Sequence, residues 1–212
     1  MIKLYALFGE GSPTSPLKLN SAAAGSALTR RFPGLLRYRQ FERTAEQFEG
    51  LIPAPFRASA ELWIDDSEDP APILDELASA ATSLPEAFAE DPVRLVQSAE
   101  HNISGEPMQD SGFKATFLFN RKADMDLGEF HAYWLGHHGP IAAQTQDAER
   151  YVQSHISVTD RSWDGITELF WADYPTALAS MASEQMRVDQ SSDAQNFVDG
   201  ESLVLFLSQE TP

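Results

Sequence analysis

The chain has 212 residues, 42% of them hydrophobic, which is enough for one larger domain or two small ones with a real core. Its formal net charge of -17 gives an acidic surface that repels phosphate backbones and anionic lipid, so neither nucleic acid nor a membrane is expected as a partner. Cysteine is absent, which excludes disulfides, thiolate nucleophiles and cysteine-ligated metal sites.

The chain opens on an apolar, strand-like run at residues 2–8. This run is too short for the hydrophobic region of a signal peptide, and Gly-Glu-Gly breaks it. No other apolar run approaches the ~20 residues that span a membrane. We therefore expect a soluble, cytoplasmic protein.

The first half continues with a helical segment, two strands, an alanine-rich helix and a closing apolar run, and the second half repeats this order. Arg37-Tyr38-Arg39-Gln40 is matched by Arg150-Tyr151-Val152-Gln153 at the start of corresponding strands. The remaining elements are expected at 60–64, 73–82 and 93–96 in the first half, and at 113–119, 167–171, 176–186 and 203–207 in the second. The order β-α-β-β-α-β appears twice, which is the ferredoxin-like pattern.

We therefore predict an α+β fold of two tandem ferredoxin-like repeats, residues 1–103 and 113–212, joined by a linker at 104–112 that is rich in turn residues. A four-stranded sheet with both helices on one face leaves the other face bare. Burying that face against its twin gives two sheets packed face to face, as a barrel-like pseudo-dimer within one chain.

All five histidines lie between His101 and His155, and three of them crowd residues 131–138. Asp126 and Glu129 predict a helix start there by reciprocal capping, and Gly139-Pro140 predicts its end. At helical spacing Phe130, Trp134 and His137 share one face, with Tyr133 and His138 on its flanks. A histidine at the helix end feels the negative end of the dipole, which favours the protonated form. The alternative to a functional histidine in this segment is a purely structural helix that packs on a sheet, in which His131 could face solvent.

Alternation along the second strand of each half gathers polar side chains on one face. Tyr151, Gln153 and His155 share a face in the second half, and Tyr38 and Gln40 share the matching face in the first. Glu61 and Glu168 also recur within otherwise apolar strands. Such groups either line a pocket between the sheets, walled by aromatic residues such as Trp134 and Phe197, or form the polar edge of a solvated sheet.

The sequence lacks the motifs of several common types of catalytic and cofactor-binding site. The histidines lack the spacing of a metal site, no G-x-S-x-G elbow is present, and no glycine-rich phosphate loop or dinucleotide fingerprint occurs. We therefore predict no metal and no cofactor, so that any chemistry runs on side chains alone.

The second half resembles the EthD domain family, which belongs to the dimeric α+β barrel superfamily. The resemblance covers about residues 113–207, and the first half reads as a degenerate copy that keeps Tyr38, Gln40 and Glu61. Four motifs in the right order carry it: Phe130-x-x-Tyr133-Trp134-x-x-x-His138-Gly139-Pro140, Arg150-Tyr151-x-Gln153-x-His155, Asp164-Gly165-x-x-Glu168, and Asp193 with Asn196-Phe197-Val198-Asp199.

The resemblance implies a cofactor-independent lyase, a dehydratase or decarboxylase, acting on a small aromatic or polyketide-like catabolic compound. It implies that His138 or His155 moves the proton, assisted by Tyr151. The candidate substrate-binding residues are Tyr133, Trp134, Gln153, Glu168, Phe197, Tyr38 and Gln40.

Two alternatives stay open: an isomerase of the same superfamily, and a non-catalytic small-molecule-binding or assembly protein in which His138 merely caps a helix. In each of the small-molecule cases the expected partner is a small aromatic or hydrophobic compound, and a further homodimer is possible.

Overall fold

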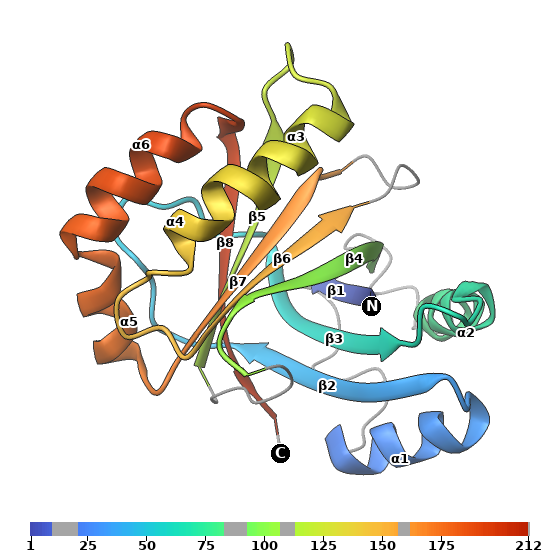
Figure 1. Cartoon of the computed structure of the whole chain (residues 1–212). Helices are drawn as coiled ribbons and strands as arrows, with labels where there is room; N and C mark the ends of the chain where they lie inside the picture. The colour runs from blue at the N-terminus through green and yellow to red at the C-terminus, as the bar shows by residue number, and fades with distance from the viewer. Residues whose placement is uncertain (10–20, 83–92, 107–112, 157–161, 212) are drawn as a thin grey trace. The chain divides into compact units, whose positions relative to one another are not determined.

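The computed structural model describes residues 1–9, 21–82, 93–106, 113–156 and 162–211 (Figure 1). The chain divides into two compact units. The first comprises Met1–Thr44, Pro55–Ala99 and Ser208–Pro212, and the second comprises Ala45–Ala54 and Glu100–Leu207. Of the predicted linker at 104–112, residues 107–112 lie outside the described ranges.

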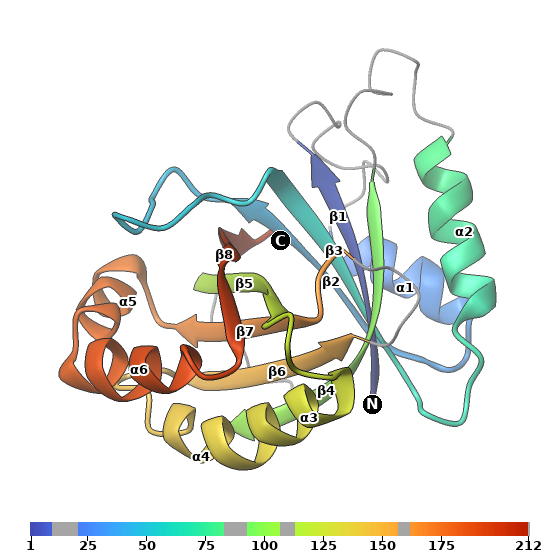
Figure 2. The same cartoon turned by 90° about the horizontal axis from the view of Figure 1, so that it is seen from above.

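In the first unit, strand β3 pairs antiparallel with β1 on one side and with β2 on the other, and the start of β4 pairs with β1. Helices α1 and α2 cover one face of these strands (Figure 2), where Leu4, Leu62 and Ile73 form part of the core. The elements are β1 (Ile2–Gly9), α1 (Ser21–Arg31), β2 (Leu35–Arg43), β3 (Phe56–Ile64), α2 (Ala71–Thr82) and β4 (Arg94–Ser104).

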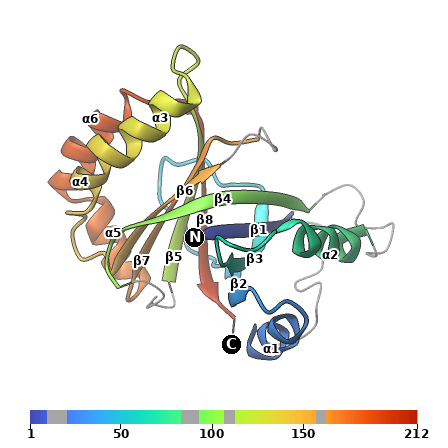
Figure 3. The same cartoon turned by 45° about the vertical axis from the view of Figure 1, so that its right-hand side comes forward.

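In the second unit, β7 lies between β5 and β6 and pairs antiparallel with both. A layer of helices covers one face of these strands (Figure 1, Figure 3). No helix in the described ranges has the length and apolarity that crossing a membrane demands. The elements are β5 (Phe113–Arg121), α3 (Leu127–Tyr133), the π-helix η2 (Trp134–His138), α4 (Gly139–Ala142), β6 (Arg150–Ile156), β7 (Gly165–Trp171), α5 (Tyr174–Met181), the π-helix η3 (Gln185–Gln190), α6 (Ser191–Ala194) and β8 (Val198–Glu210).

The expected sheet arrangement is wrong. The hydrogen-bonded strand order is β1-β3-β2-β8-β5-β7-β6-β4, and it closes into a single barrel rather than two four-stranded ferredoxin-like sheets packed face to face. An open sheet leaves a row of unpaired N–H and C=O groups at each edge, and closure pairs them. The strands that would have been edges, β4 with 11 residues and β8 with 13, are much longer than the four and five residues predicted for them.

The recurring glutamates form buried ion pairs within each unit. Lys3 Nζ lies 2.9 Å from Glu61 Oε2, and Lys114 Nζ lies 2.8 Å from Glu168 Oε1. All four side chains are almost completely buried. A buried carboxylate requires such a partner, because removing an unpaired charge from water costs several kcal/mol. The two glutamates are therefore explained by their lysine partners.

Helix α3 begins as predicted but does not end as predicted. Asp126 Oδ1 accepts a hydrogen bond from the Glu129 backbone N–H at 2.7 Å, and Glu129 Oε2 accepts one from the Asp126 backbone N–H at 3.4 Å, so the capping box is confirmed. At Gly139 the chain keeps helical dihedral angles and continues into α4. Pro140 has no N–H to donate, and the wider π-turn of η2 accommodates a proline within a helix that continues.

Candidate functional site

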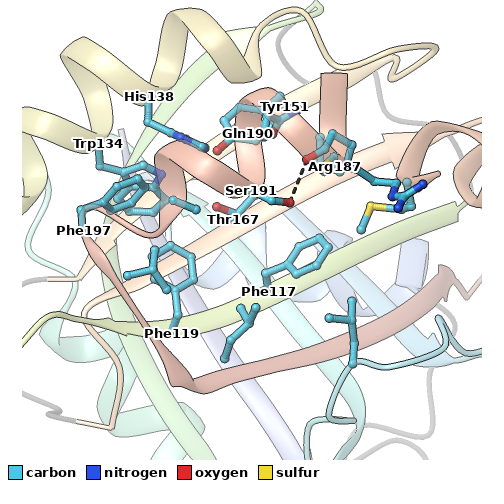
Figure 4. A pocket seen from close by; sticks show the side chains of 17 residues that line it. Phe117, Phe119, Trp134, His138, Tyr151, Thr167, Arg187, Gln190, Ser191 and Phe197 are labelled. Carbon is cyan, nitrogen blue, oxygen red and sulfur yellow. Dashed lines mark hydrogen bonds between the residues drawn. The ribbon is translucent and has the colours of Figure 1, made fainter. Parts of the chain in front are cut away.

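An apolar cavity of about 220 Å³ lies in the second unit, between the β5–β7–β6 strands and the helical layer (Figure 4). It is larger than the roughly 150 Å³ cavity that holds benzene in an engineered protein core, so a substituted aromatic ring fits. Its walls are Leu51, Phe117, Phe119, Trp134, His138, Tyr151, Thr167, Leu169, Met181, Met186, Arg187, Gln190, Ser191, Ala194, Phe197, Val198 and Leu203.

Strand alternation decides which side chains reach the cavity. Phe117 and Phe119 come from β5, and Thr167 and Leu169 come from β7. Glu168, between these two, points to the opposite face of β7, where it pairs with a lysine. The structure therefore does not bring Glu168 to the cavity.

Two π-helical segments supply much of the helical wall. Trp134 and His138 belong to η2, and Met186, Arg187 and Gln190 belong to η3. The wider turn of η2 shifts the helical phase, so His138 is buried while His137 keeps 61% of its side chain exposed. An unbroken α-helical period predicts His137 on the face of Phe130 and Trp134 with His138 on its flank, whereas His138 is the one buried with these two residues. Short π-helices of this kind are frequent at functional sites.

His138 is held by a carboxylate from the facing helix. Its Nδ1 lies 2.8 Å from Oδ2 of Asp193 in α6. This contact leaves Nε2 as the ring nitrogen available to the cavity that His138 lines. Phe197 packs edge-on against the imidazole, with ring centroids 5.0 Å apart. Such a carboxylate fixes both the tautomer and the orientation of a histidine.

Three further side chains contact Oδ1 of Asp193. Tyr133 donates its hydroxyl hydrogen to this atom at 2.7 Å, and His137 Nε2 and Asn196 Nδ2 lie 3.3 and 3.5 Å from it. Burial alone raises the pKa of Asp193, but hydrogen bonds from Tyr133 and His138 outweigh it and leave the pKa below its usual value. Asp193 is therefore a carboxylate at neutral pH. Tyr133, predicted to bind substrate, instead holds this carboxylate.

Burial lowers the pKa of His138 below its ordinary value of 6.5, although the hydrogen bond to Asp193 opposes the shift. At neutral pH the imidazole is therefore uncharged, and its free nitrogen can accept a proton. The expectation that the helix dipole favours the charged form is wrong for this residue. The reason is that His138 does not end the helix and is withdrawn from water.

Tyr151 lines the same cavity as His138 and keeps its hydroxyl protonated. Burial raises the pKa of Tyr151, and hydrogen bonds with Thr167, Trp134 and Gln153 offset the shift only in part. Figure 4 shows His138, Tyr151 and Gln190 on one side of the cavity, with Phe117 and Phe119 across from them. A phenol that stays protonated is a hydrogen-bond donor for an oxygen atom of a ligand.

His155 lies in a stack of rings and is not among the residues that line the cavity. Its ring stacks on Trp134 at 4.8 Å and on His131 at 4.4 Å, with His101 4.3 Å away. Burial and the neighbouring histidines lower the pKa of His155 to about 3. His131 is half-buried here, contrary to the idea that it faces solvent.

Gln153 supports the helix and does not reach the cavity. Its Nε2 donates to the Trp134 carbonyl at 2.9 Å, and its Oε1 lies 3.2 Å from His155 Nε2. The same carbonyl accepts the Gly139 N–H, which is the defining bond of the π-turn. Gln153 therefore fixes the segment that carries His138.

Tyr38 and Gln40 belong to the first unit and are absent from the cavity lining as described. Gln40 Nε2 donates to the Tyr38 hydroxyl. Burial raises the pKa of Tyr38 to about 12. This hydrogen bond is of the kind that buried polar side chains usually form in protein interiors.

Four of the ten predicted site residues line the cavity: His138, Tyr151, Trp134 and Phe197. Sequence reasoning did not assign a role to Asp193, although one of the quoted motifs contains it. It also missed Phe117 and Phe119, which alternate on a strand and could have been found from that pattern, and Arg187, for which the local sequence gives no signal. No set of three or more histidine, aspartate or glutamate side chains in the described ranges is arranged to hold a metal ion.

Comparisons with known proteins agree with the resemblance noted for the second half. The model of the EthD domain matches residues 122–201. A search of the curated proteins found no match to the sequence.

Solved structures similar to this chain include three with TM-scores between 0.56 and 0.59. A candidate monooxygenase from Lactobacillus acidophilus is 10% identical, at a TM-score of 0.56, with 99% of this chain and 92% of that chain covered. A candidate chlorite dismutase is 10% identical, at 0.59, with 99% and 94% covered. An anthrone oxidase-like protein is 12% identical, at 0.57, with 100% and 91% covered.

Identities this low show a common fold alone, which is an α+β barrel. The cavity, the His138–Asp193 pair and Tyr151 all lie within the second unit, and each of these residues falls inside the matched range. The similarity to the EthD domain thus covers residues 122–201, the part of the chain that holds these residues.

Proposed function

We propose that the protein is a cofactor-independent lyase that acts on a small aromatic compound bound in the cavity, with His138 as the general base. One observation carries this proposal: Asp193 holds Nδ1 of His138 at 2.8 Å, so that Nε2 is left for the apolar cavity. The lowered pKa of His138 makes the neutral, proton-accepting form dominant at pH 7.

The neutral imidazole favours dehydration over decarboxylation, because dehydration begins with removal of a proton. Nε2 of His138 takes a hydrogen from the carbon next to a ring carbonyl, and the electron pair of that C–H bond moves onto the carbonyl oxygen. Tyr151 donates a hydrogen bond to this oxygen, an interaction that an apolar, water-poor site strengthens. The pair then returns to form a C=C bond, the neighbouring C–OH bond breaks, and the proton on Nε2 leaves with hydroxide as water.

The same base also suits an isomerase, in which the proton returns to a different carbon of the substrate. A non-catalytic binding protein would use the same cavity without any proton transfer. The identity of the reaction product distinguishes a lyase from an isomerase. Exchange of a substrate proton with solvent distinguishes both enzymes from a non-catalytic binding protein.

The test uses 1-tetralone and 2-tetralone, two-ring ketones with acidic hydrogens next to the carbonyl. Each ketone is incubated with the protein in D₂O, and deuterium incorporation is followed by NMR. We expect exchange above the buffer rate in the wild type and its loss in His138→Ala. A surface variant, Arg94→Gln, serves as the matched control because Arg94 is exposed and is not among the residues that line the cavity. Exchange at equal rates in His138→Ala and wild type would contradict the role of His138.

A positive result then leads to substrates that carry a hydroxyl on the carbon beyond the exchanging position. Loss of water gives a conjugated product with a new ultraviolet band, whereas isomerisation leaves the mass unchanged. Saturable binding of these ketones with no exchange would favour the non-catalytic alternative.

A further inference from the structure

We propose that the ligand of this cavity is an aromatic carboxylic acid whose carboxylate is bound by Arg187. This inference rests on the proposed function for the position of the ring, and it adds the charge that the ligand carries. Arg187 supplies the positive charge among the described residues of the cavity lining. Its side chain is exposed, whereas the neighbouring Met186 is buried in the cavity wall.

Arg187 and the base lie on different sides of the cavity. In Figure 4, His138, Trp134 and Phe197 lie together on one side, and Arg187 lies on the other, with Thr167 and Ser191 between them. A ligand can therefore place a carbonyl or phenol oxygen beside Tyr151 and His138, its ring against Phe117 and Phe119, and an anionic group at Arg187.

Arg187 is not already neutralised within the part of the chain that the structure describes. No ion pair or side-chain hydrogen bond of Arg187 occurs there, whereas Arg121 and Arg150 pair with Asp164 and Glu100 at 2.6 and 2.9 Å. The nearest acid in η3, Asp189, lines a separate surface depression with Ile141 and Ser192. The guanidinium is therefore available to a ligand, and its planar fork matches the two oxygens of a carboxylate.

The charge of the protein explains why one cation can select the ligand. With a net charge of -17, the surface as a whole repels anions. The rest of the lining offers an anion little compensation, since His138 is uncharged at neutral pH and the walls are mainly apolar. Binding of a carboxylate in the cavity is therefore favourable where the carboxylate can pair with Arg187.

The experiment compares 2-naphthoate with its neutral amide, two probes of nearly equal shape. Binding is measured by titration of tryptophan fluorescence, because Trp134 forms part of the cavity wall. We expect 2-naphthoate to bind the wild type roughly tenfold more tightly than it binds Arg187→Gln, as for a partly solvated, charge-assisted pair. The amide is expected to bind both proteins within about twofold, and added salt is expected to weaken only the binding of the acid.

Arg94→Gln removes the same charge from an exposed position outside the cavity and controls for net charge. It is expected to bind 2-naphthoate like the wild type, and Arg187→Lys to bind it with intermediate affinity. Thermal unfolding of each variant shows that its fold is retained. Equal loss in Arg187→Gln and Arg94→Gln, no preference for the acid over the amide, or no binding of either probe would overturn the proposal.

The tetralone exchange assay fails independently of this one, because those ketones carry no charge. Exchange without a preference for the acid would remove only the role of Arg187. A preference for the acid that depends on Arg187, without exchange, would remove only the role of His138 as a base.

Discussion

Nδ1 of His138 lies 2.8 Å from Oδ2 of Asp193, although 55 residues separate them in the sequence. The contact joins the π-helix η2 to helix α6, and Tyr133 braces the same carboxylate from one turn earlier. The orientation of His138 in the cavity is therefore set by two helices, neither of which could fix it alone.

The first prediction concerns this pair. Asp193→Asn replaces an acceptor by an amide that can donate to Nδ1, which favours the tautomer with its proton on Nε2 and removes the base from the cavity. We expect kcat, or the deuterium exchange rate, to fall by about 10²-fold or more. Tyr133→Phe removes one hydrogen bond to Asp193 and leaves the carboxylate, so a loss of only a few-fold is expected. Equal losses in the two variants would show that Asp193 does not set the tautomer.

The second prediction is a pH dependence. His138 is active when neutral, and burial holds its pKa below 6.5, so kcat/KM should be constant near pH 7 and fall only as the pH drops below 6.5. Asp193 raises the pKa of His138, so Asp193→Asn should move this fall to still lower pH. The profile is measured with a neutral ketone, because a carboxylic acid would itself titrate. A fall that begins above pH 7 would contradict the assignment.

Local patterns in the sequence were enough to predict most of the elements. The capping box at Asp126 and Glu129 depends on side chains three residues apart, and it is confirmed. Closure of the barrel depends instead on how far β4 and β8 extend past their apolar runs, into segments where polar residues such as Glu100, Asn102 and Gln209 interrupt the apolar pattern. Apolar periodicity does not report those residues as strand, so the two-sheet arrangement was predicted in error.

In the candidate site, too, the features that depend on local sequence were easier to predict than those that depend on tertiary packing. Trp134, His138 and Tyr151, which line the cavity, could be chosen from the sequence because their residue types stand out within motifs. The phase shift at η2 was not predicted. One extra residue in a single helical turn does not produce a recognisable change in the apolar periodicity of a five-residue segment. Arg187 reaches the cavity because η3 packs over the sheet, and that packing is a tertiary property.

The third prediction concerns stability at low pH. His155 is buried and its folded-state pKa is about 3, whereas an unfolded histidine titrates near 6.5. Between these values the unfolded state binds more protons, so the free energy of unfolding falls as the pH drops from 6.5 towards 3, by about 1.4 kcal/mol per pH unit for one such group. His155→Phe keeps a ring against Trp134 and cannot titrate, so its urea denaturation curves should show a smaller slope with pH. A His155→Phe protein that keeps the wild-type slope would show that His155 is not the group responsible.

The last prediction concerns Gly165, the first residue of β7, where the Trp134 ring lies against the backbone. A Cβ atom there would lie 2.7 and 2.9 Å from ring atoms of Trp134 and 3.2 Å from the Phe119 ring. Both rings are buried and cannot retreat, so Gly165→Ala should reduce the free energy of unfolding by about 1–3 kcal/mol and weaken ligand binding by displacing a cavity wall. Gly136→Ala is the matched control: its Cβ meets nothing within 4 Å in a helical segment, so stability should stay equal or rise by up to about 1 kcal/mol. Urea denaturation of both variants decides the matter, and a Gly165→Ala protein as stable as Gly136→Ala would show that Trp134 is free to move.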